Sequence, residues 1–371
     1  MNQHLQFIKL GGMPLPPFIP VLGGWVESDH KKITDTKDQL TIFNNTDEWE
    51  LRKRLANPYE LIYSADDSFP CLAKVSALSR SYFKMTEMLN LIDFWSNKKT
   101  IKTAHACEGP GGFIQSVVDE SVRRKVHTES IHAITLKPTR SYIPGWRRSF
   151  YFLRKHPEIE LDYGADGTGD ILLPENQKHF CKKVTSCNLF TADGGFDFSI
   201  DYNSQEKNVF QLLVASFIIG LQVLCEDGVL IIKFFDIYSA ATQDLILGSA
   251  SCFKEFTIYK PVTSRPCNSE RYFIGKGFLK RPSTKAWVTY LQDVYEKNYK
   301  TTFTQFTRFF INTWPSTLQA LLDEQIHWQE NLQIQSIYNT LNLDKKNITA
   351  ILDKNIELCK RWCDDNHIET L

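Results

Sequence analysis

Three features that would classify a protein quickly are absent from this sequence. The 371-residue chain has no formal net charge, with 43 basic and 43 acidic residues, so its overall charge gives no sign of a nucleic-acid partner. Its nine cysteines are an odd number and contain no CxxC pair, which argues against a disulfide framework and against a metal site. From this cysteine pattern we expect reduced thiols in a cytosol-like compartment. No repeat with a period of 20 to 50 residues is visible, which argues against a solenoid.

The sequence also offers no clear signal for secretion or for a membrane. The N-terminus lacks a basic leader followed by an apolar core and a small-residue cleavage site. The longest apolar run, residues 209–225, is slightly short for a membrane span, contains Gln211 and Gln222, and continues into a turn. We expect this run to form a buried helix packed on a sheet, without a membrane partner. A cytoplasmic location is expected, with a viral factory, a virion and the nucleus left open.

The charged residues are unevenly distributed along the chain. Residues 76–285 hold 27 lysines and arginines against 22 acidic residues, whereas residues 1–75 and 286–371 are mildly acidic. A basic middle region is compatible with a surface that follows RNA.

Apolar runs alternate with helical periodicity between residues 76 and 285. This alternation predicts an α/β domain with a mainly parallel, doubly wound, seven-stranded sheet. The short link between the runs at 255–260 and 271–278 predicts that the last strand is antiparallel. Residues 1–75 are predicted to be an N-terminal extension that is irregular over its Gly- and Pro-rich start. Residues 286–371 are predicted to be a C-terminal helical extension, which either covers the sheet or binds a partner.

The stretch TADGGFDF, residues 191–198, places Asp193 at the end of an apolar run. Ligands of open α/β sheets bind beyond the carboxyl ends of the strands, so we expect a binding crevice at Asp193. An earlier turn, CEGPGGF at 107–113, is rich in glycine and leads into a helix. Glycines let a ligand approach the backbone, and the helix N-terminus directs its amides to the same place, which is typical of a nucleotide-like cofactor.

Two further segments bear on the choice of ligand. The strand after the glycine turn ends in Leu136 and Lys137 rather than in the acid that holds the ribose in NAD enzymes, which argues against NAD. The loop YGADGTGDI, residues 163–171, carries Asp166 and Asp170 and suits an adenine edge or a ribose. Residues 139–160 are basic and aromatic, and two interpretations stay open. They could stack on single-stranded RNA, or they could form an aromatic helix that packs on the sheet with its arginines in water.

Six motifs in order then resemble one family. They are the Ser-Arg-x-x-x-Lys segment at 79–84, CEGPGGF, YGADGTGDI, TADGGF, LIIKFF and KPVTSRPCNSERYFIGKGF. Over about residues 76–280 they are similar to the FtsJ-like RNA 2′-O-methyltransferases, and within that family to the cap-ribose enzymes of cells and of large cytoplasmic DNA viruses. The resemblance implies a Rossmann-like fold, S-adenosyl-L-methionine as cofactor and the 5′ end of capped mRNA as partner. It also raises the prospect that the C-terminal helices bind other capping or transcription proteins.

The resemblance carries the family's catalytic tetrad onto Lys84, Asp193, Lys233 and Glu270. Lysine has an ordinary pKa of about 10.4, too high for a base at neutral pH. Burial, the second lysine and the sulfonium of the cofactor disfavour the charged amine, so we expect the pKa of Lys233 to be lowered. Lys233 would then serve as the general base, Asp193 would orient it, and the other two residues would position the ribose hydroxyl.

The same resemblance implies binding residues. Those expected at the cofactor are Glu108, Gly109, Pro110, Gly111, Gly112, Phe113, Asp166, Asp170 and Asp193. His105 stands where the family often has an acid, and Glu108 is expected to hold the methionine amino group instead. The residues expected at the substrate are Glu206, Arg265 and Ser269. For Glu206, in the segment DYNSQEKN at 201–208, an equally good interpretation is a capped helix start. Ribosomal or transfer RNA as substrate, and a non-catalytic RNA-binding subunit, are the alternatives to cap methylation.

Overall fold

The computed structural model describes most of the chain. The described residues are 7–9, 15–40, 47–63, 71–140, 145–195, 203–301, 303–310, 314–343 and 347–371. The last residues of TADGGFDF, the first two of DYNSQEKN, residues 141–144 of the basic aromatic segment and part of the Gly- and Pro-rich start lie outside them.

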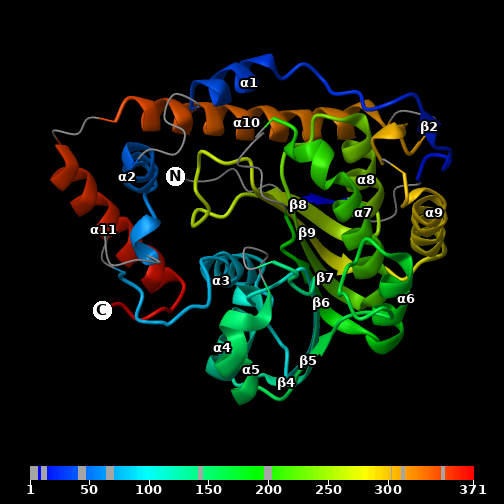
Figure 1. The fold of residues 1–371 in the computed structure, drawn as a ribbon, viewed down its shortest axis with the longest axis horizontal. Coiled ribbons are helices and arrows are strands. Elements are labelled where there is room, and N and C mark those ends of the chain that lie inside the picture. The colour runs from blue at the N-terminus through cyan, green and yellow to red at the C-terminus, as the bar shows by residue number, and fades with distance from the viewer. Residues whose placement is uncertain are drawn as a thin grey trace.

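An eight-stranded sheet forms the centre of the molecule (Figure 1). Its order is β1-β8-β9-β7-β6-β3-β4-β5. The strands from β5 to β7 are parallel neighbours, while β9 is antiparallel to both β7 and β8. The strand bounds are β1 (Ile8–Lys9), β3 (Thr100–Ala106), β4 (His127–Ile134), β5 (Ile159–Asp162), β6 (Cys187–Ala192), β7 (Leu224–Phe234), β8 (Phe253–Tyr259) and β9 (Arg271–Phe278).

The predicted sheet of seven strands with an antiparallel last strand is confirmed by this arrangement. One strand was not predicted. Strand β1, from the N-terminal extension, pairs with β8 and extends the sheet. Along the central strands neighbouring residues enter different cores: Leu189 and Ile231 pack on one face of the sheet, and Phe190 and Ile232 on the other. Burial on both faces explains why these strands appear in the sequence as continuous apolar runs.

Helices cover both faces of the sheet. The first face packs against α3 (Ser81–Leu91) and α4 (Gly112–Arg123). The second face packs against a larger group that centres on α7 (Gln205–Val223), the helix predicted from the longest apolar run. None of the described helices is long and apolar enough to cross a membrane. The other helices of the sheet region are α5 (Phe150–Lys155), α6 (Pro174–Lys183), α8 (Ala240–Ala250) and α9 (Pro282–Asn298), with a 3₁₀ turn, η3 (Trp146–Ser149).

The two extensions pack against each other and against the sheet region. The long helix α10 (Ser316–Leu341) lies beside α1 (Lys31–Asp38) and α2 (Asp47–Ala56) (Figure 1). Leu318, Leu322 and Ile326 of α10 belong to the main core, so this helix covers the sheet region. The last helix, α11 (Ile348–Asp365), contacts α2 and the 3₁₀ turn η2 (Glu60–Ile62).

The sequence predicted a helical C-terminal extension, and the structure adds a strand to its helices. The extension contains the short strand β10 (Phe306–Arg308), which pairs with β2 (Val21–Leu22) of the N-terminal extension, after the 3₁₀ turn η4 (Phe303–Gln305). A two-residue partner strand leaves too little alternation to predict β10 from the sequence.

Candidate active site

Lys84 and Glu270 form a buried ion pair at the carboxyl end of the central strands. Nζ of Lys84, on α3, lies 2.6 Å from Oε1 of Glu270, the residue before β9. The hydroxyl of Ser264 donates to the same oxygen over 2.8 Å. Burial raises the pKa of the Glu270 carboxyl, but the nearby amines of Lys84 and Lys233 lower it by more, to about 2. Glu270 is therefore a firmly ionised carboxylate.

Asp193 and Lys233 form the second pair. Asp193 follows the end of β6, and Lys233 lies near the end of β7. Nζ of Lys233 lies 3.2 Å from Oδ1 of Asp193 and donates to its backbone carbonyl over 2.7 Å. The hydroxyl of Tyr272 donates to the same Oδ1 over 2.9 Å. The two pairs are neighbours, since Glu270 raises the pKa of Lys233 and Lys233 lowers that of Glu270. All four residues of the predicted tetrad thus meet at one place.

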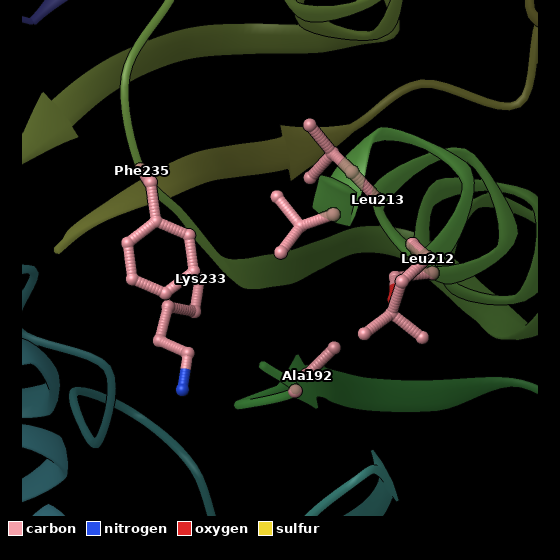
Figure 2. A pocket seen from close by; sticks show the side chains of 8 residues that line it. Ala192, Leu212, Leu213, Lys233 and Phe235 are labelled. Atoms are coloured by element: carbon pink, nitrogen blue, oxygen red, sulfur yellow. The ribbon is translucent and has the colours of Figure 1, made fainter. Parts of the chain in front are cut away.

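Apolar side chains surround the stem of Lys233. Figure 2 shows the lysine running beside the ring of Phe235, with Leu212 and Leu213 of α7 to one side. Nζ lies 5.9 Å from the centre of the Phe235 ring. Only the amine end of Lys233 therefore reaches the polar cluster, where Asp193 holds it.

The pKa of Lys233 is raised, whereas the sequence predicted that it would be lowered. Burial lowers it, as expected, but Asp193, Glu270 and Glu108 together raise it by more. The sequence argument counted the second lysine and omitted Glu108, which adds a third carboxylate to the cluster. Lys233 therefore holds its proton more firmly than an ordinary lysine does.

The glycine turn brings α4 close to its neighbours. Gly111 has a φ of 102°, which favours glycine, directly before α4. A Cβ on Gly109 would lie 2.8 Å from Cα of Gly145, and one on Gly112 would lie 2.2 Å from the hydroxyl oxygen of Ser81. Gly112 thus lets the first turn of α4 contact the first turn of α3, the helix that carries Lys84.

The other two predicted residues of the turn have different surroundings. Phe113 is fully buried, and its ring packs in the core between α3, α4 and the sheet. The carbonyl of Pro110 accepts a hydrogen bond from the hydroxyl of Ser149. This bond ties the turn to the segment before α5.

Glu108 ends a buried polar chain. Its Oε1 accepts a hydrogen bond of 2.6 Å from the hydroxyl of Thr191. His105 lies 2.7 Å from that same hydroxyl oxygen through Nδ1 and 2.8 Å from the hydroxyl oxygen of Thr103 through Nε2. Burial raises the pKa of Glu108 well above its usual range, and Asp193 adds to the rise. The other oxygen, Oε2, is buried and has no hydrogen-bond partner among the described residues.

The loop with the two aspartates is built on the end of β4. A Cβ on Gly169 would lie 2.0 Å from the carbonyl oxygen of Thr135, so only glycine permits this contact. Asp166 lies at the exposed tip, where Oδ1 accepts from the amide and hydroxyl of Thr168. Asp170 is half-buried and close enough to Cys107, after β3, to raise the pKa of its thiol. Asp170 is therefore the aspartate nearer to the glycine turn.

The three predicted substrate residues are engaged inside the protein. Glu206 is 4% exposed, and its two oxygens accept from the backbone amides of Tyr238 and Ser239 over 2.7 and 2.9 Å. Glu206 thus braces the chain after β7, a role different from the predicted contact with a guanine and from simple capping of its own helix. The guanidinium of Arg265 pairs with Glu60, and the hydroxyl of Ser269 donates to Gln205; the distances are 2.9 and 2.6 Å.

The basic aromatic segment combines parts of both interpretations. Trp146 is buried against Ile114 and Ile131, as the packed-helix interpretation requires. Phe150 and Tyr151 of α5 are 60% and 77% exposed, as an RNA-stacking surface would require.

Comparison with known proteins places this arrangement in a family. The family model described as "FtsJ-like methyltransferase" matches residues 77–278, more than half of the chain and within the predicted domain of residues 76–285. The chain belongs to the FtsJ-like methyltransferase family.

The chain is similar to two curated methyltransferases and spans about a third and about half of their lengths. A cap-specific mRNA (nucleoside-2′-O-)-methyltransferase 1 from Danio rerio is 30% identical over 277 residues, 68% of this chain but only 31% of the relative. A protein named "Probable methyltransferase EP424R" from African swine fever virus is 30% identical over 222 residues, 55% of this chain and 50% of the relative. Among solved structures, one described as a ribosomal RNA methyltransferase from Plasmodium falciparum is 18% identical with a TM-score of 0.38, covering 55% of this chain and 99% of its own. The likeness to that structure adds no argument to the assignment.

The FtsJ-like methyltransferases use S-adenosyl-L-methionine, and the residues present fit it. The unpartnered, buried Oε2 of Glu108 can accept from the amino group of the methionine part. The turn at Gly111 and the N-terminus of α4 leave backbone groups available beside it. Among the described residues, no group of three or more His, Cys, Asp or Glu side chains could hold a metal ion.

Several residues of this methyltransferase site were not predicted. Tyr272 contacts Asp193, Ser264 contacts Glu270, and Glu87 contacts the segment between β8 and β9. The carboxylate of Glu87 accepts from Tyr259, Val262, Thr263 and Trp362. A signal was present for Glu87, which lies three residues after Lys84 and so near the same face of α3.

Proposed function

We propose that this methyltransferase transfers a methyl group to the ribose 2′-oxygen of the first transcribed nucleotide of capped RNA. The observation that carries the proposal is the convergence of Lys84, Asp193, Lys233 and Glu270 beside the glycine turn. A ribose hydroxyl needs a proton acceptor and firm positioning, and this cluster offers both.

When bound, S-adenosyl-L-methionine supplies an activated methyl group on a positively charged sulfonium. Transfer of that methyl group to a ribose 2′-oxygen would break its bond to sulfur and leave a neutral thioether, with Glu108 and the turn at Gly111 holding the methionine part of the cofactor. The hydroxyl proton goes to Nζ of Lys233, which must be neutral to receive it. In this proposal Asp193 keeps that amine in place through the contacts at 3.2 and 2.7 Å.

Lys84 and Glu270 have the positioning role. Glu270 is ionised and can accept a hydrogen bond from a ribose hydroxyl, while Lys84 keeps its carboxylate fixed over 2.6 Å. Three carboxylates raise the pKa of Lys233, so its proton must be lost before transfer. A positive charge brought close to Lys233 favours that loss.

Capped RNA is proposed as the substrate because the Danio rerio relative is named as a cap-specific mRNA 2′-O-methyltransferase. Ribosomal or transfer RNA remains the alternative substrate. Cytoplasmic location and partners of the C-terminal helices stay predictions.

The test is transfer of tritiated methyl groups to three RNAs of one sequence, carrying an N7-methylated cap, an unmethylated cap or no cap. Nuclease digestion then shows which nucleotide is methylated and on which oxygen. We expect methylation of the first ribose on capped RNA and loss of transfer in Lys233→Ala. Equal methylation of capped and uncapped RNA would support the alternative substrates, and an inactive protein whose melting temperature does not rise with S-adenosyl-L-methionine would support a non-catalytic role.

A further inference from the structure

Glu60, in the N-terminal extension, is a buried carboxylate outside the tetrad. It begins the 3₁₀ turn η2 and is 4% exposed. It also lies outside residues 77–278, which the family model matches. Ile62, at the end of the same turn, packs in one core with Phe83 of α3. The turn is therefore seated against the helix that carries Lys84.

Two guanidinium groups meet at the Glu60 carboxylate. Its Oε1 lies 2.7 Å from Nη2 of Arg80. Arg265 donates from Nη2 to the same oxygen over 2.9 Å and from Nε to Oε2 over 3.2 Å, which makes a forked pair. The side-chain amide of Asn57 donates to Oε2 over 2.6 Å. These donors fix the carboxylate, and the carboxylate holds both arginines at one point.

Electrostatic attraction keeps this cluster together. Burial raises the pKa of Glu60, but Arg265 and Arg80 lower it by more, so the carboxylate is ionised. Burial and the nearby Arg265 lower the pKa of Arg80, whereas Glu60 raises it. The two guanidinium groups thus repel each other, and Glu60 offsets the repulsion. Without Glu60, two cations would face each other in a partly buried place, which is unfavourable.

Each arginine leads to one half of the pair formed by Lys84 and Glu270. Arg80 directly precedes α3, and Lys84 follows one helical turn later on the same side of the helix. Arg265 lies between β8 and β9, next to Ser264, whose hydroxyl donates to Glu270 over 2.8 Å. The connections form a closed ring, which runs from Lys84 through Arg80, Glu60, Arg265 and Ser264 to Glu270 and back to Lys84.

We propose that Glu60 is a positioning residue for methyl transfer, an inference that rests on the proposed function. By holding both arginines, Glu60 sets the distance between Lys84 and Glu270, the pair that positions the ribose hydroxyl. Part of the N-terminal extension therefore belongs to the catalytic unit, although it lies outside the region that the family model matches.

The test removes the carboxylate and then returns it as a small ion. Glu60→Ala should lower kcat on the order of tenfold or more, because a displacement of about 1 Å can cost roughly 100-fold. The Kd for S-adenosyl-L-methionine should stay unchanged, since the glycine turn is untouched. Formate has the charge and shape of the lost group and should restore kcat in a saturable manner. Neutral formamide, at equal ionic strength, should not.

Glu120→Ala is the matched control. Glu120 is also a buried carboxylate, held by Arg123 and Arg124 on α4 away from the tetrad. This variant should keep the wild-type kcat, and formate should not change it. If Glu60→Ala does not fold, Glu60→Gln compared with Glu120→Gln gives the same contrast in kcat at an unchanged Kd.

The proposal is overturned if Glu60→Ala keeps the wild-type kcat, or if formamide restores kcat as well as formate does. A second measurement does not need methyl transfer. The backbone amides of residues 261–270 should exchange hydrogen faster in Glu60→Ala than in the wild type, and formate should slow them again. If exchange responds in this way but the wild type methylates no RNA, the linkage through Glu60 stands and the proposed function fails. Unchanged exchange would overturn the linkage.

Discussion

Tyr272 lies directly opposite Lys233 in the antiparallel ladder between β7 and β9, and its hydroxyl donates to Asp193. Residues opposite each other in a ladder point to the same face of the sheet. Burial and Asp193 keep the pKa of Tyr272 well above its ordinary value, so the hydroxyl stays a donor. Asp193 is thus held from two sides, by an amine and by a phenol.

Removing that phenol should slow the reaction while sparing cofactor binding. In Tyr272→Phe, Asp193 loses a hydrogen bond to a charged group, worth about 1.5–3 kcal/mol, so we expect kcat to fall on the order of tenfold. Steady-state kinetics with saturating cofactor checks this. Tyr290→Phe, which removes a half-buried phenol bonded to the carbonyl of Phe309, should keep the wild-type kcat. Equal losses in both variants would contradict the positioning role.

The two loop aspartates should differ in their effect on cofactor affinity. Asp170 lies close to Cys107 at the glycine turn, whereas Asp166 is exposed and bonded to Thr168. Asp170→Asn should weaken S-adenosyl-L-methionine on the order of tenfold, since hydrogen bonds to a charged group are worth about 1.5–3 kcal/mol. Asp166→Asn should change the Kd little, because asparagine can still accept from Thr168. Calorimetric titration measures both, and the reverse order would assign the adenosine contact to Asp166.

The sequence predicted the sheet because strands and helices leave local signals, whereas the tetrad was implied by the resemblance of its motifs to the family. Apolar runs that end in turns locate β3, β6 and β7, and the residues just beyond them must share the carboxyl edge of a parallel sheet. This rule places Glu108 and Asp193 together without any knowledge of tertiary contacts.

The remaining residues depend on register and on distant segments. Tyr272 sits inside an apolar strand, and only its pairing with Lys233 directs it to Asp193. Glu206 follows a motif-like loop, yet backbone amides 32 and 33 residues later turn it inward. Glu60 carries no motif, and its place between Arg80 and Arg265 follows from how the N-terminal extension packs against α3. Contacts of this range leave no periodic trace in a single sequence.

Glu87 should matter for catalysis without touching a substrate. Its carboxylate ties α3 to Val262 and Thr263, in the segment that leads to Glu270, and to Trp362 of α11. Glu87→Gln would direct an N–H₂ group at these donors, so we expect the protein to lose about 2 kcal/mol of stability. We also expect lower kcat with an unchanged Kd for S-adenosyl-L-methionine, because Lys84 and Glu270 would shift relative to each other.

The control for Glu87 is another buried carboxylate. Glu120, on α4, pairs with Arg123 and Arg124 away from the tetrad. Glu120→Gln should lower the melting temperature and leave kcat unchanged. If Glu87→Gln retains full kcat at a temperature where it is folded, the positioning role is excluded.

The pH dependence of the reaction should reflect the three carboxylates around Lys233. Because they raise its pKa, the neutral amine is scarce at neutral pH and increases as the pH rises. We expect kcat to rise about tenfold per pH unit over the range where Lys233 is mostly charged. Glu270→Gln removes one of these carboxylates. Its kcat should be lower than that of the wild type, and the rise of kcat with pH should be displaced toward lower pH. A wild-type kcat that is flat between about pH 6 and 9 would exclude Lys233 as the base.

His105 should make folding stability depend on pH in the acid range. Burial, with a contribution from His132, lowers its pKa in the folded protein to about 3, whereas an unfolded histidine has a pKa of about 6.5. Between these values the unfolded chain binds the extra proton, so stability is lost as the pH falls below 6.5. The expected loss from this residue is roughly 1.4 kcal/mol per pH unit. In His105→Gln the glutamine amide can still bond to Thr103 and Thr191. The free energy of unfolding, measured with urea at about pH 7 and 5.5, should differ between the two pH values by less than in the wild type, and the reduction should be about that amount. His327→Gln, at an exposed position on α10, should keep the wild-type difference. An unchanged pH dependence in His105→Gln would mean that the buried imidazole takes up a proton in the folded state.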